Sequence, residues 1–382
     1  MVTRALAALF LALTAAPALA QSTDPAFAGQ WTWSPETLAA EATGLGGAFV
    51  TTVRGGEALY WSPAGMTFDS GIDVRTFMGA RPGLGVVYHG ERLHLGFGVR
   101  RTFSRTQHGR GFDASSQTFE SGQFAVMVDQ AAVGAAVHSG RLRLGAMLAA
   151  GPMKTSGVWS RVAASPTPGA AATEVRYDYT GADEWLVGGA TSALVELLGV
   201  HPMARSQARI GVAVRWPSML RTPRYRRSRL LLPAFQAEGP DLQRFRLPQM
   251  ISVGGEARLS VLSMMRSVRI SIGADWTDYA GVLETARANG LEPGTSLAFD
   301  EDRAWIFGGG LEAVHTLGRL RVGVRERADH RLVTGPGPVG PKNPRLTFGA
   351  SRDAVIAGKR LQLDIDSTSS FDDLVLSTRI LW

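Results

Sequence analysis

The chain has 382 residues, of which 45 are glycine and none is cysteine, and only 19% are charged. That charged fraction is below the roughly 25% of an ordinary soluble domain. The absence of cysteine excludes disulfide frameworks, thiolate metal sites and thiol nucleophiles. The 40 basic residues exceed the 33 acidic ones, giving a net charge of +7, but they are spread along the chain. We therefore expect no nucleic-acid partner.

The first twenty residues have the pattern of a secretory signal peptide. Arg4 supplies a positive charge, residues 5–15 are apolar, and Ala18-Leu19-Ala20 fits a cleavage site. We expect residues 1–20 to be removed, so that the mature chain begins at Gln21. No later uncharged stretch reaches about 18 residues, so the sequence predicts no transmembrane helix.

Six later segments alternate between apolar residues on one face and polar or small residues on the other, with Met147 as the exception. In the first, residues 92–99, the apolar residues Leu93, Leu95, Phe97 and Val99 all fall on one face. A period of two indicates a strand with one apolar and one polar face. The other five segments are 141–148, 210–216, 268–276, 319–324 and 360–365.

Each alternating segment begins after a short turn and ends before a longer, polar stretch. Short turns at one end and long loops at the other are typical of an outer-membrane barrel. With the returning strands included, the sequence predicts fourteen strands. Their expected ranges are 67–78, 83–89, 92–104, 117–137, 141–152, 184–199, 207–218, 247–263, 266–277, 302–316, 319–328, 344–355, 359–366 and 371–382.

A soluble β-sandwich would alternate in the same way, but three features favour a barrel. Trp216, Trp276 and Trp305 lie near the long-loop ends of strands, where an aromatic girdle belongs. The last strand ends in Trp382 on its apolar face, which is similar to the sorting signal of outer-membrane barrels. The polar face carries arginines suited to a water-filled lumen, and we take them as candidate lumenal or ligand-binding residues. They are Arg100, Arg143, Arg215, Arg269, Arg321 and Arg325.

Several blocks of sequence carry a resemblance to a known family. Residues 44–50 and 57–66 precede the predicted barrel, and 209–217, 247–255 and 272–279 follow within it. In order and spacing these blocks resemble the FadL-type outer-membrane transporters of long-chain fatty acids and hydrocarbons. The hatch of that family ends in Asn-Pro-Ala-Gly. The equivalent element is Ser62, Pro63, Ala64 and Gly65, with Ser62 in place of Asn.

This resemblance implies an all-β fold, a transmembrane antiparallel β-barrel of about 14 strands with an N-terminal plug, or hatch. Residues 21–66 would form the plug and residues 67–382 the barrel. The protein would lie in the outer membrane of a Gram-negative cell and take up a hydrophobic small molecule, with the hatch rearranging to let it leave. Two exit routes stay open, a lateral one through a gap in the wall and a periplasmic one. We expect a monomer whose other partners are membrane lipid and lipopolysaccharide.

An alternative is a PorV-like barrel that acts with protein partners in secretion or surface assembly. Proteins of that group share a similar Gly-Gly-Ala-Phe-Val and Tyr-Trp-x-Pro-Ala-Gly beginning, which the Tyr60-Trp61 pair fits. The blocks at Leu247-Pro248 and Asp275-Trp276-Thr277 favour the transporter instead.

The sequence does not predict an enzyme. It contains no G-x-S-x-G, H-E-x-x-H or G-x-x-x-x-G-K-[ST] motif, and we expect no cofactor. Four histidines near predicted short turns are interpreted as polar turn residues rather than metal ligands. They are His89, His138, His201 and His315.

The loop at 219–246 combines arginines with an apolar run. Contact with lipopolysaccharide phosphates is favoured over ligand capture for its arginines, which are Arg221, Arg224, Arg226, Arg227 and Arg229. Ligand capture and loop packing remain equal alternatives for the apolar residues. Those residues are Leu230, Leu231, Leu232 and Phe235.

Overall fold

The structure is a computed structural model. It describes residues 40–78, 82–113, 118–163, 173–180, 184–198, 206–216, 219–221, 225–229, 237–238, 244–246, 249–260, 265–278, 297–299, 303–326, 332–334, 344–368 and 374–382. The predicted signal peptide and residues 21–39 of the predicted plug lie outside these ranges. Among the described residues, no helix has the length and hydropathy needed to cross a membrane.

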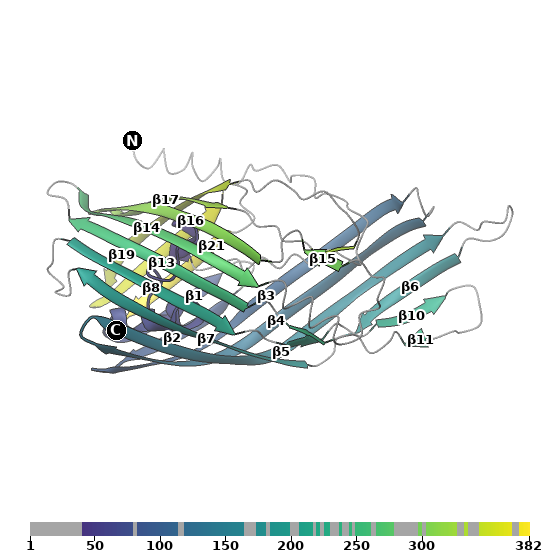
Figure 1. Cartoon of the computed structure of the whole chain (residues 1–382), viewed down its shortest axis with the longest axis horizontal. Helices are drawn as coiled ribbons and strands as arrows, with labels where there is room; N and C mark the ends of the chain where they lie inside the picture. The colour runs from purple at the N-terminus through teal and green to yellow at the C-terminus, as the bar shows by residue number, and fades with distance from the viewer. Residues whose placement is uncertain are drawn as a thin grey trace.

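Fourteen antiparallel strands form a closed ring, as the sequence predicts (Figure 1). In ring order they are β1 (Gly71–Met78), β2 (Gly83–His89), β3 (Leu93–Asp113), β4 (Thr118–Ser139), β5 (Leu142–Ala163), β7 (Glu184–Leu198), β8 (Ser206–Trp216), β13 (Gln249–Ser260), β14 (Met265–Asp278), β16 (Arg303–His315), β17 (Gly318–Glu326), β19 (Pro344–Ile356), β20 (Lys359–Thr368) and β21 (Val375–Leu381). Each strand pairs with the next.

The ring closes where β21 pairs with β1. Backbone hydrogen bonds extend this seam past the end of β21. The amide of Trp382 donates to the carbonyl of Ile72 at 3.0 Å, and the amide of Ile72 donates to Trp382 at 3.4 Å. The seam therefore leaves no open strand edge at this point of the wall.

Additional strands lie at the long-loop end, opposite the short turns (Figure 1). The strand β6 (Thr173–Thr180) pairs with the far part of β5 and with β10 (Tyr225–Arg229), which pairs with β11 (Ala237–Glu238). Two small sheets join β9 (Met219–Arg221) to β12 (Arg244–Arg246) and β15 (Leu297–Phe299) to β18 (Leu332–Thr334). These segments are predicted to be loops, because the stretches that contain them are polar and rich in glycine and proline.

The alternation of the wall follows the predicted register. Leu95 and Phe97 of β3 are exposed on the outer face, whereas His94, Gly96 and Arg100 are buried on the inner face. A strand with this pattern presents apolar side chains to lipid and polar ones to the lumen. The predicted register of β3 is therefore confirmed.

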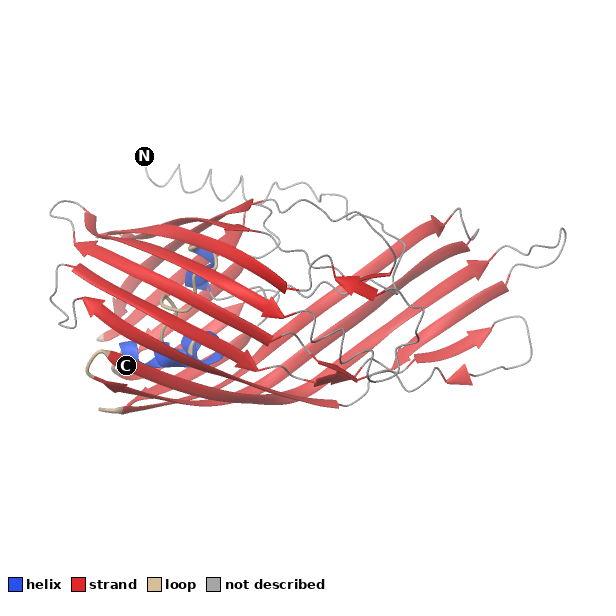
Figure 2. Ribbon diagram, in the orientation of Figure 1, coloured by secondary structure: helices blue, strands red, loops and turns tan. Residues whose placement is uncertain are grey.

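The plug, defined here as residues 40–69, lies inside the ring at its short-turn end (Figure 2). It contains the helix α2 (Ala40–Gly44), the helix α3 (Gly55–Trp61) and the 3-10 helix η2 (Pro63–Phe68). Because η2 continues to Phe68, the first wall strand begins at Gly71 and not at residue 67 as predicted.

Candidate functional site: the plugged lumen

The predicted hatch motif forms a corner that rests against the wall. Ser62 ends α3, and its hydroxyl donates to the carbonyl of Val50 at 2.9 Å. Pro63 occupies the first turn of η2, where a missing N–H has no cost. The amide of Ala64 donates to the Ser192 hydroxyl on β7 at 2.8 Å. The motif therefore fixes both the bend of the plug and its contact with the wall.

At one point the plug and the wall approach backbone to backbone. Gly46 has φ of +67°, a conformation that side chains rarely allow. A Cβ atom added to Gly308 of β16 would lie only 1.9 Å from the carbonyl oxygen of Gly46. The two glycines allow the plug to lie directly on the sheet.

A chain of buried charges joins the plug to the wall. The Glu57 carboxylate of α3 lies 2.7 Å from Nη1 of Arg75 on β1. Nη2 of Arg75 also donates to Asp364 of β20 at 2.9 Å. Arg321 of β17 donates to Asp364 at 3.0 Å and to Asp366 at 2.9 Å. Since an unpaired buried charge is costly, these groups hold one another in a single arrangement.

The last plug residue, Asp69, is bound to the strand that closes the ring. Arg379 of β21 donates to the carboxylates of Asp69 and Asp73. Burial alone would raise the pKa of the Asp69 carboxyl, but the positive charges of Arg379 and Arg54 hold that pKa below its ordinary value. Asp69 is therefore ionised at neutral pH and ties the plug to β21.

Among the predicted lumenal arginines, some bind a carbonyl or an aromatic ring of the plug. Nη1 of Arg143 donates to the carbonyl of Thr67 at 2.8 Å. The guanidinium carbons of Arg215 and Arg100 lie 3.6 and 5.4 Å from the centre of the Trp61 ring. A cation over an indole face is attracted by the ring quadrupole, so the plug is held through its aromatic residues as well.

The other three predicted arginines bind carboxylates of the wall. Arg269 and Arg321 both donate to Glu312 of β16, at 3.0 and 2.9 Å. Arg325 lies 3.3 Å from Asp275 of β14. The structure thus brings all six arginines to the lumenal side, where they hold the wall and the plug together. Their role in ligand binding stays a prediction.

Three histidines form a row at the short-turn end of β2, β3 and β4. Nδ1 of His89 lies 3.2 Å from Nδ1 of His94, and Nε2 of His94 lies 3.2 Å from Nδ1 of His138. His94, which joins the other two, is not among the histidines predicted near short turns. Nδ1 of His315 accepts a turn amide at 3.1 Å, and His201 lies outside the described residues. In the described part of the chain, no group of three or more His, Asp or Glu is arranged to hold a metal ion.

The loop at 219–246, with its arginines and its apolar run, is described only in part. Arg221 lies in β9, and Arg226, Arg227 and Arg229 lie in β10. Arg224 and the apolar residues lie outside the described ranges. Those apolar residues are Leu230, Leu231, Leu232 and Phe235.

The carboxylates and the arginine that hold the plug at the seam are not among the predicted site residues. Asp73 and Arg75 are two residues apart, as are Asp364 and Asp366, so each pair lies on one face of its strand. Charged pairs at this spacing inside predicted strands are the signal that could have marked them. Glu57 gives no such signal, because it lies in a helix of only seven residues.

Three neighbouring strands lose regular pairing at the same level of the wall. A bulge in β3 shifts the register against β4 between Arg101 and Phe103. The ladder between β4 and β5 keeps its register but skips the residues 129–130 and 151–152. Pro152 contributes to this break, because proline has no backbone N–H to donate. The wall is therefore less firmly bonded here than in the regular ladders on either side.

Comparisons with known proteins identify the fold. No protein-family model matches the chain, and no curated protein matches it. Among solved structures, the toluene transporter TbuX of Ralstonia pickettii matches with a TM-score of 0.54 and 15% identity, covering 89% of this chain and 95% of TbuX. The toluene transporter TodX of P. putida matches with a TM-score of 0.55 and 13% identity, covering 89% of this chain and 95% of TodX.

A FadL homologue of Pseudomonas aeruginosa also matches, with a TM-score of 0.57 and 11% identity, covering 92% of this chain and 97% of the homologue. Such low identities carry information on the fold alone, but the coverage includes nearly all of each molecule. Together with the closed ring of fourteen strands and the internal plug, the comparisons show that this chain has the fold of the FadL-type outer-membrane transporters.

Proposed function

We propose that this protein takes up a hydrophobic small molecule, a long-chain fatty acid or a hydrocarbon, across the outer membrane. The observation that carries the proposal is the plug inside a closed ring of fourteen strands. Barrels of sixteen strands hold aqueous channels, so a ring of about fourteen has room for a passage that a plug can close. The solved structures of similar fold are named as toluene transporters and a FadL homologue, which supports the same class of cargo.

The outer face of the wall supports insertion into a membrane. Ile272 of β14 and Phe307 of β16 are exposed apolar residues, and many similar side chains surround the ring. Trp276 and Trp305 are directly paired near the long-loop end, and Trp216 lies at the same end of β8. Aromatic residues are enriched at this level of membrane barrels. With residues 1–20 as a cleaved signal peptide, the expected location is the outer membrane of a Gram-negative cell.

The proposed route leaves the lumen sideways through β3, β4 and β5. The bulge at Arg101–Phe103 and the skipped pairs opposite Pro152 support this route, because fewer backbone bonds must be broken there. Arg101 and Asp129 form an ion pair of 2.8 Å between β3 and β4 at the same level. An exit into the hydrocarbon layer suits an apolar cargo, since the cargo then never has to enter water.

An uptake assay tests the proposal. Cells without their own transporter of this type would be supplied in turn with labelled oleate and with toluene, with and without this protein. We expect faster uptake of at least one of them in cells that make it. Equal uptake of both compounds in the two cell lines would contradict the proposal.

A reversible lock tests the role of the plug. The chain contains no cysteine, so the double variant Ala64→Cys/Ser192→Cys introduces one defined disulfide between plug and wall. The hydrogen bond of 2.8 Å between these residues places their Cα atoms within about 7 Å, the limit for a disulfide. We expect the oxidised variant to lose uptake and to regain it on reduction, while each single variant transports normally. Full uptake by the oxidised form would show that this contact need not open.

A further inference from the structure

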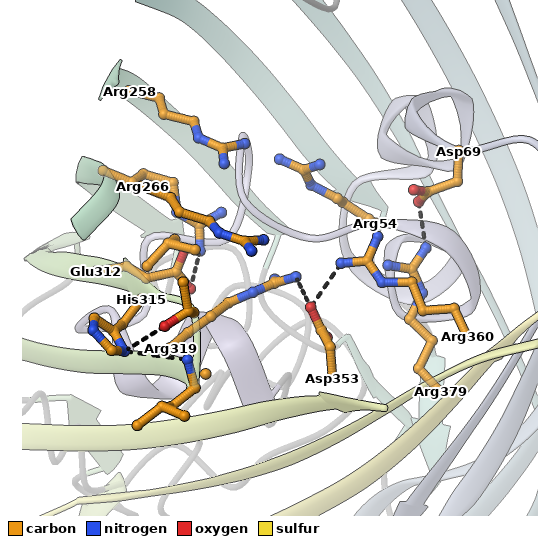
Figure 3. A pocket seen from close by; sticks show the side chains of 15 residues that line it. Arg54, Asp69, Arg258, Arg266, Glu312, His315, Arg319, Asp353, Arg360 and Arg379 are labelled. Carbon is orange, nitrogen blue, oxygen red and sulfur yellow. Dashed lines mark hydrogen bonds and ion pairs between the residues drawn. The ribbon is translucent and has the colours of Figure 1, made fainter. Parts of the chain in front are cut away.

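A cavity of about 320 Å³ lies between the plug and the wall at the short-turn end of the lumen. Its wall residues come from β13, β14, β16, β17, β19, β20 and β21 and the turn between β16 and β17, and the plug contributes Arg54 and Asp69 (Figure 3). Small-molecule sites range from about 300 to 1,000 Å³, so this volume suits a small molecule or the head group of a longer one.

The residues that line the cavity carry an excess of positive charge. Seven of them are arginines and three are acidic, which gives 7 − 3 = +4 with histidine neutral. Asp73 and Glu256 lie outside the lining and pair with Arg379 and Arg269. When both carboxylates are included, the formal net charge around the cavity is still 4 − 2 = +2. The cavity therefore favours an anion.

The pairing inside the cavity is incomplete. Asp353 is shared between Arg319 and Arg360, at 3.2 and 2.7 Å. Arg258 donates to a serine hydroxyl at 3.0 Å. Within the described ranges, neither Arg258 nor Arg266 has a carboxylate at ion-pair distance. Figure 3 shows that both side chains extend toward Arg54 of the plug, so three guanidinium groups converge from the wall and the plug.

We propose that this cavity binds an oxyanion, the carboxylate or phosphate group of a small molecule. The planar guanidinium donates two parallel hydrogen bonds to either group, and it does so more strongly than to a neutral acceptor. An anion between Arg54, Arg258 and Arg266 relieves the repulsion among them. It also connects the plug to the wall, so its binding stabilises the plugged state. A neutral hydrocarbon has no group that these residues can bind.

Calorimetry on the full-length protein in a nonionic detergent at low salt tests this site. The probes are inorganic phosphate, octanoate, and octanol as a neutral molecule of the same chain length. Phosphate and octanoate should bind, and more weakly as salt is raised. In the variant Arg258→Gln/Arg266→Gln their affinity should fall about tenfold or more, because each lost charged hydrogen bond is worth about that factor.

The matched control is Arg352→Gln. Arg352 precedes Asp353 in β19 and is exposed on the opposite face of the strand, so its loss should leave binding unchanged. Competition between phosphate and octanoate would support one shared head-group site. Binding of only one anion would also support the site, and would show whether it takes a phosphate or a carboxylate. If neither anion binds, or if the double variant binds both as the wild type does, the proposal is wrong.

Two further checks keep the result interpretable. Band mobility before and after heating shows whether each variant is folded. If the double variant does not fold, the single change Arg266→Glu at an exposed position of β14 replaces it, with the same loss of affinity expected. The assay measures binding without transport, so its failure is distinct from a failure of the uptake proposal.

Discussion

Glu57 of the plug and Arg75 of the first wall strand form an ion pair of 2.7 Å in which neither side chain is exposed to solvent. The other guanidinium nitrogens of Arg75 donate hydrogen bonds to Asp364 of β20 and Ser377 of β21, the last two strands before the seam. One guanidinium therefore connects the plug to both sides of the closure. The plug and the integrity of the ring depend on the same buried charges.

The first prediction concerns this pair. Glu57→Ala leaves Arg75 with one buried carboxylate fewer, and breaking a buried pair typically costs about 3–5 kcal/mol. We expect a loss near the lower end of that range, because Asp364 remains. Urea unfolding in detergent, followed by band mobility, measures it.

The control for this prediction is Arg101→Gln, which removes a pair whose side chains are 30% and 41% exposed. Such a pair contributes about 1 kcal/mol or less. Equal losses in the two variants would contradict the assigned role of the buried pair.

The second prediction concerns acid pH. The pKa of Asp69 is lower in the folded protein than in the unfolded chain, where a carboxyl of this type titrates near about 3.9. Its contribution to stability is complete above that value and is lost as the pH falls through the lower, folded pKa. Below about pH 4 we expect the free energy of unfolding to depend less on pH in Asp69→Asn than in the wild type. Some pH dependence remains in the variant, because other carboxylates also titrate there. Identical pH profiles would show that the contact of Asp69 with Arg379 does not stabilise the plug.

The third prediction concerns the lipid-facing wall. Ile272, in the middle of β14, and Leu259, near the short-turn end of β13, are 64% and 51% exposed. Arginine at mid-membrane on this face costs about 2–4 kcal/mol, but only about 0–1 kcal/mol near the interface. Ile272→Arg should therefore destabilise the inserted barrel more than Leu259→Arg does, as measured by unfolding in lipid vesicles. The reverse order would mean that the barrel sits at a different depth.

The fourth prediction separates two roles of Trp382. Its ring lies beside the Lys359 ammonium, 2.9 Å from the ring centre, and its backbone is bonded to Ile72. Trp382→Ala removes the ring but keeps the backbone hydrogen bonds to Ile72, whereas deletion of Trp382 removes the ring and these bonds. If the aromatic ring is the sorting signal, both changes lower the amount of heat-modifiable protein in the membrane. Normal insertion of Trp382→Ala would limit the role of this residue to the seam.

The sequence predicts the wall well, because alternation is a local property. In β3 the residues Leu93, Leu95, Phe97 and Val99 reveal both the strand and its lipid-facing side. Prediction of the strand ends is poorer where the pattern is interrupted. The bulge after Arg101 and the proline at position 152 break the alternation, so β3 and β5 continue to Asp113 and Ala163 although their predicted ends are 104 and 152.

The contacts of the plug were largely beyond prediction, because they join residues far apart in the chain. Arg75 and Asp364 are 289 residues apart, and no local pattern pairs them. The hatch motif marks where the plug bends, but its contact with Ser192 follows only from the closed ring. Arg258 and Arg266 come from the neighbouring strands β13 and β14, but their approach to Arg54 of the plug depends on the closed ring.

The seam has a consequence for the order of assembly. Ring closure needs β21, whereas the plug precedes every wall strand in the chain. The Thr347 hydroxyl, in a strand formed late in the sequence, donates to the carbonyl of Gly44 across 303 residues. Contacts of such separation form slowly, since the entropy of closing a long loop must be overcome first. We therefore expect the plug to be enclosed while the wall forms around it. If the sheet closed first, the plug would remain outside the ring, and the charges that it buries in the folded state would stay in water.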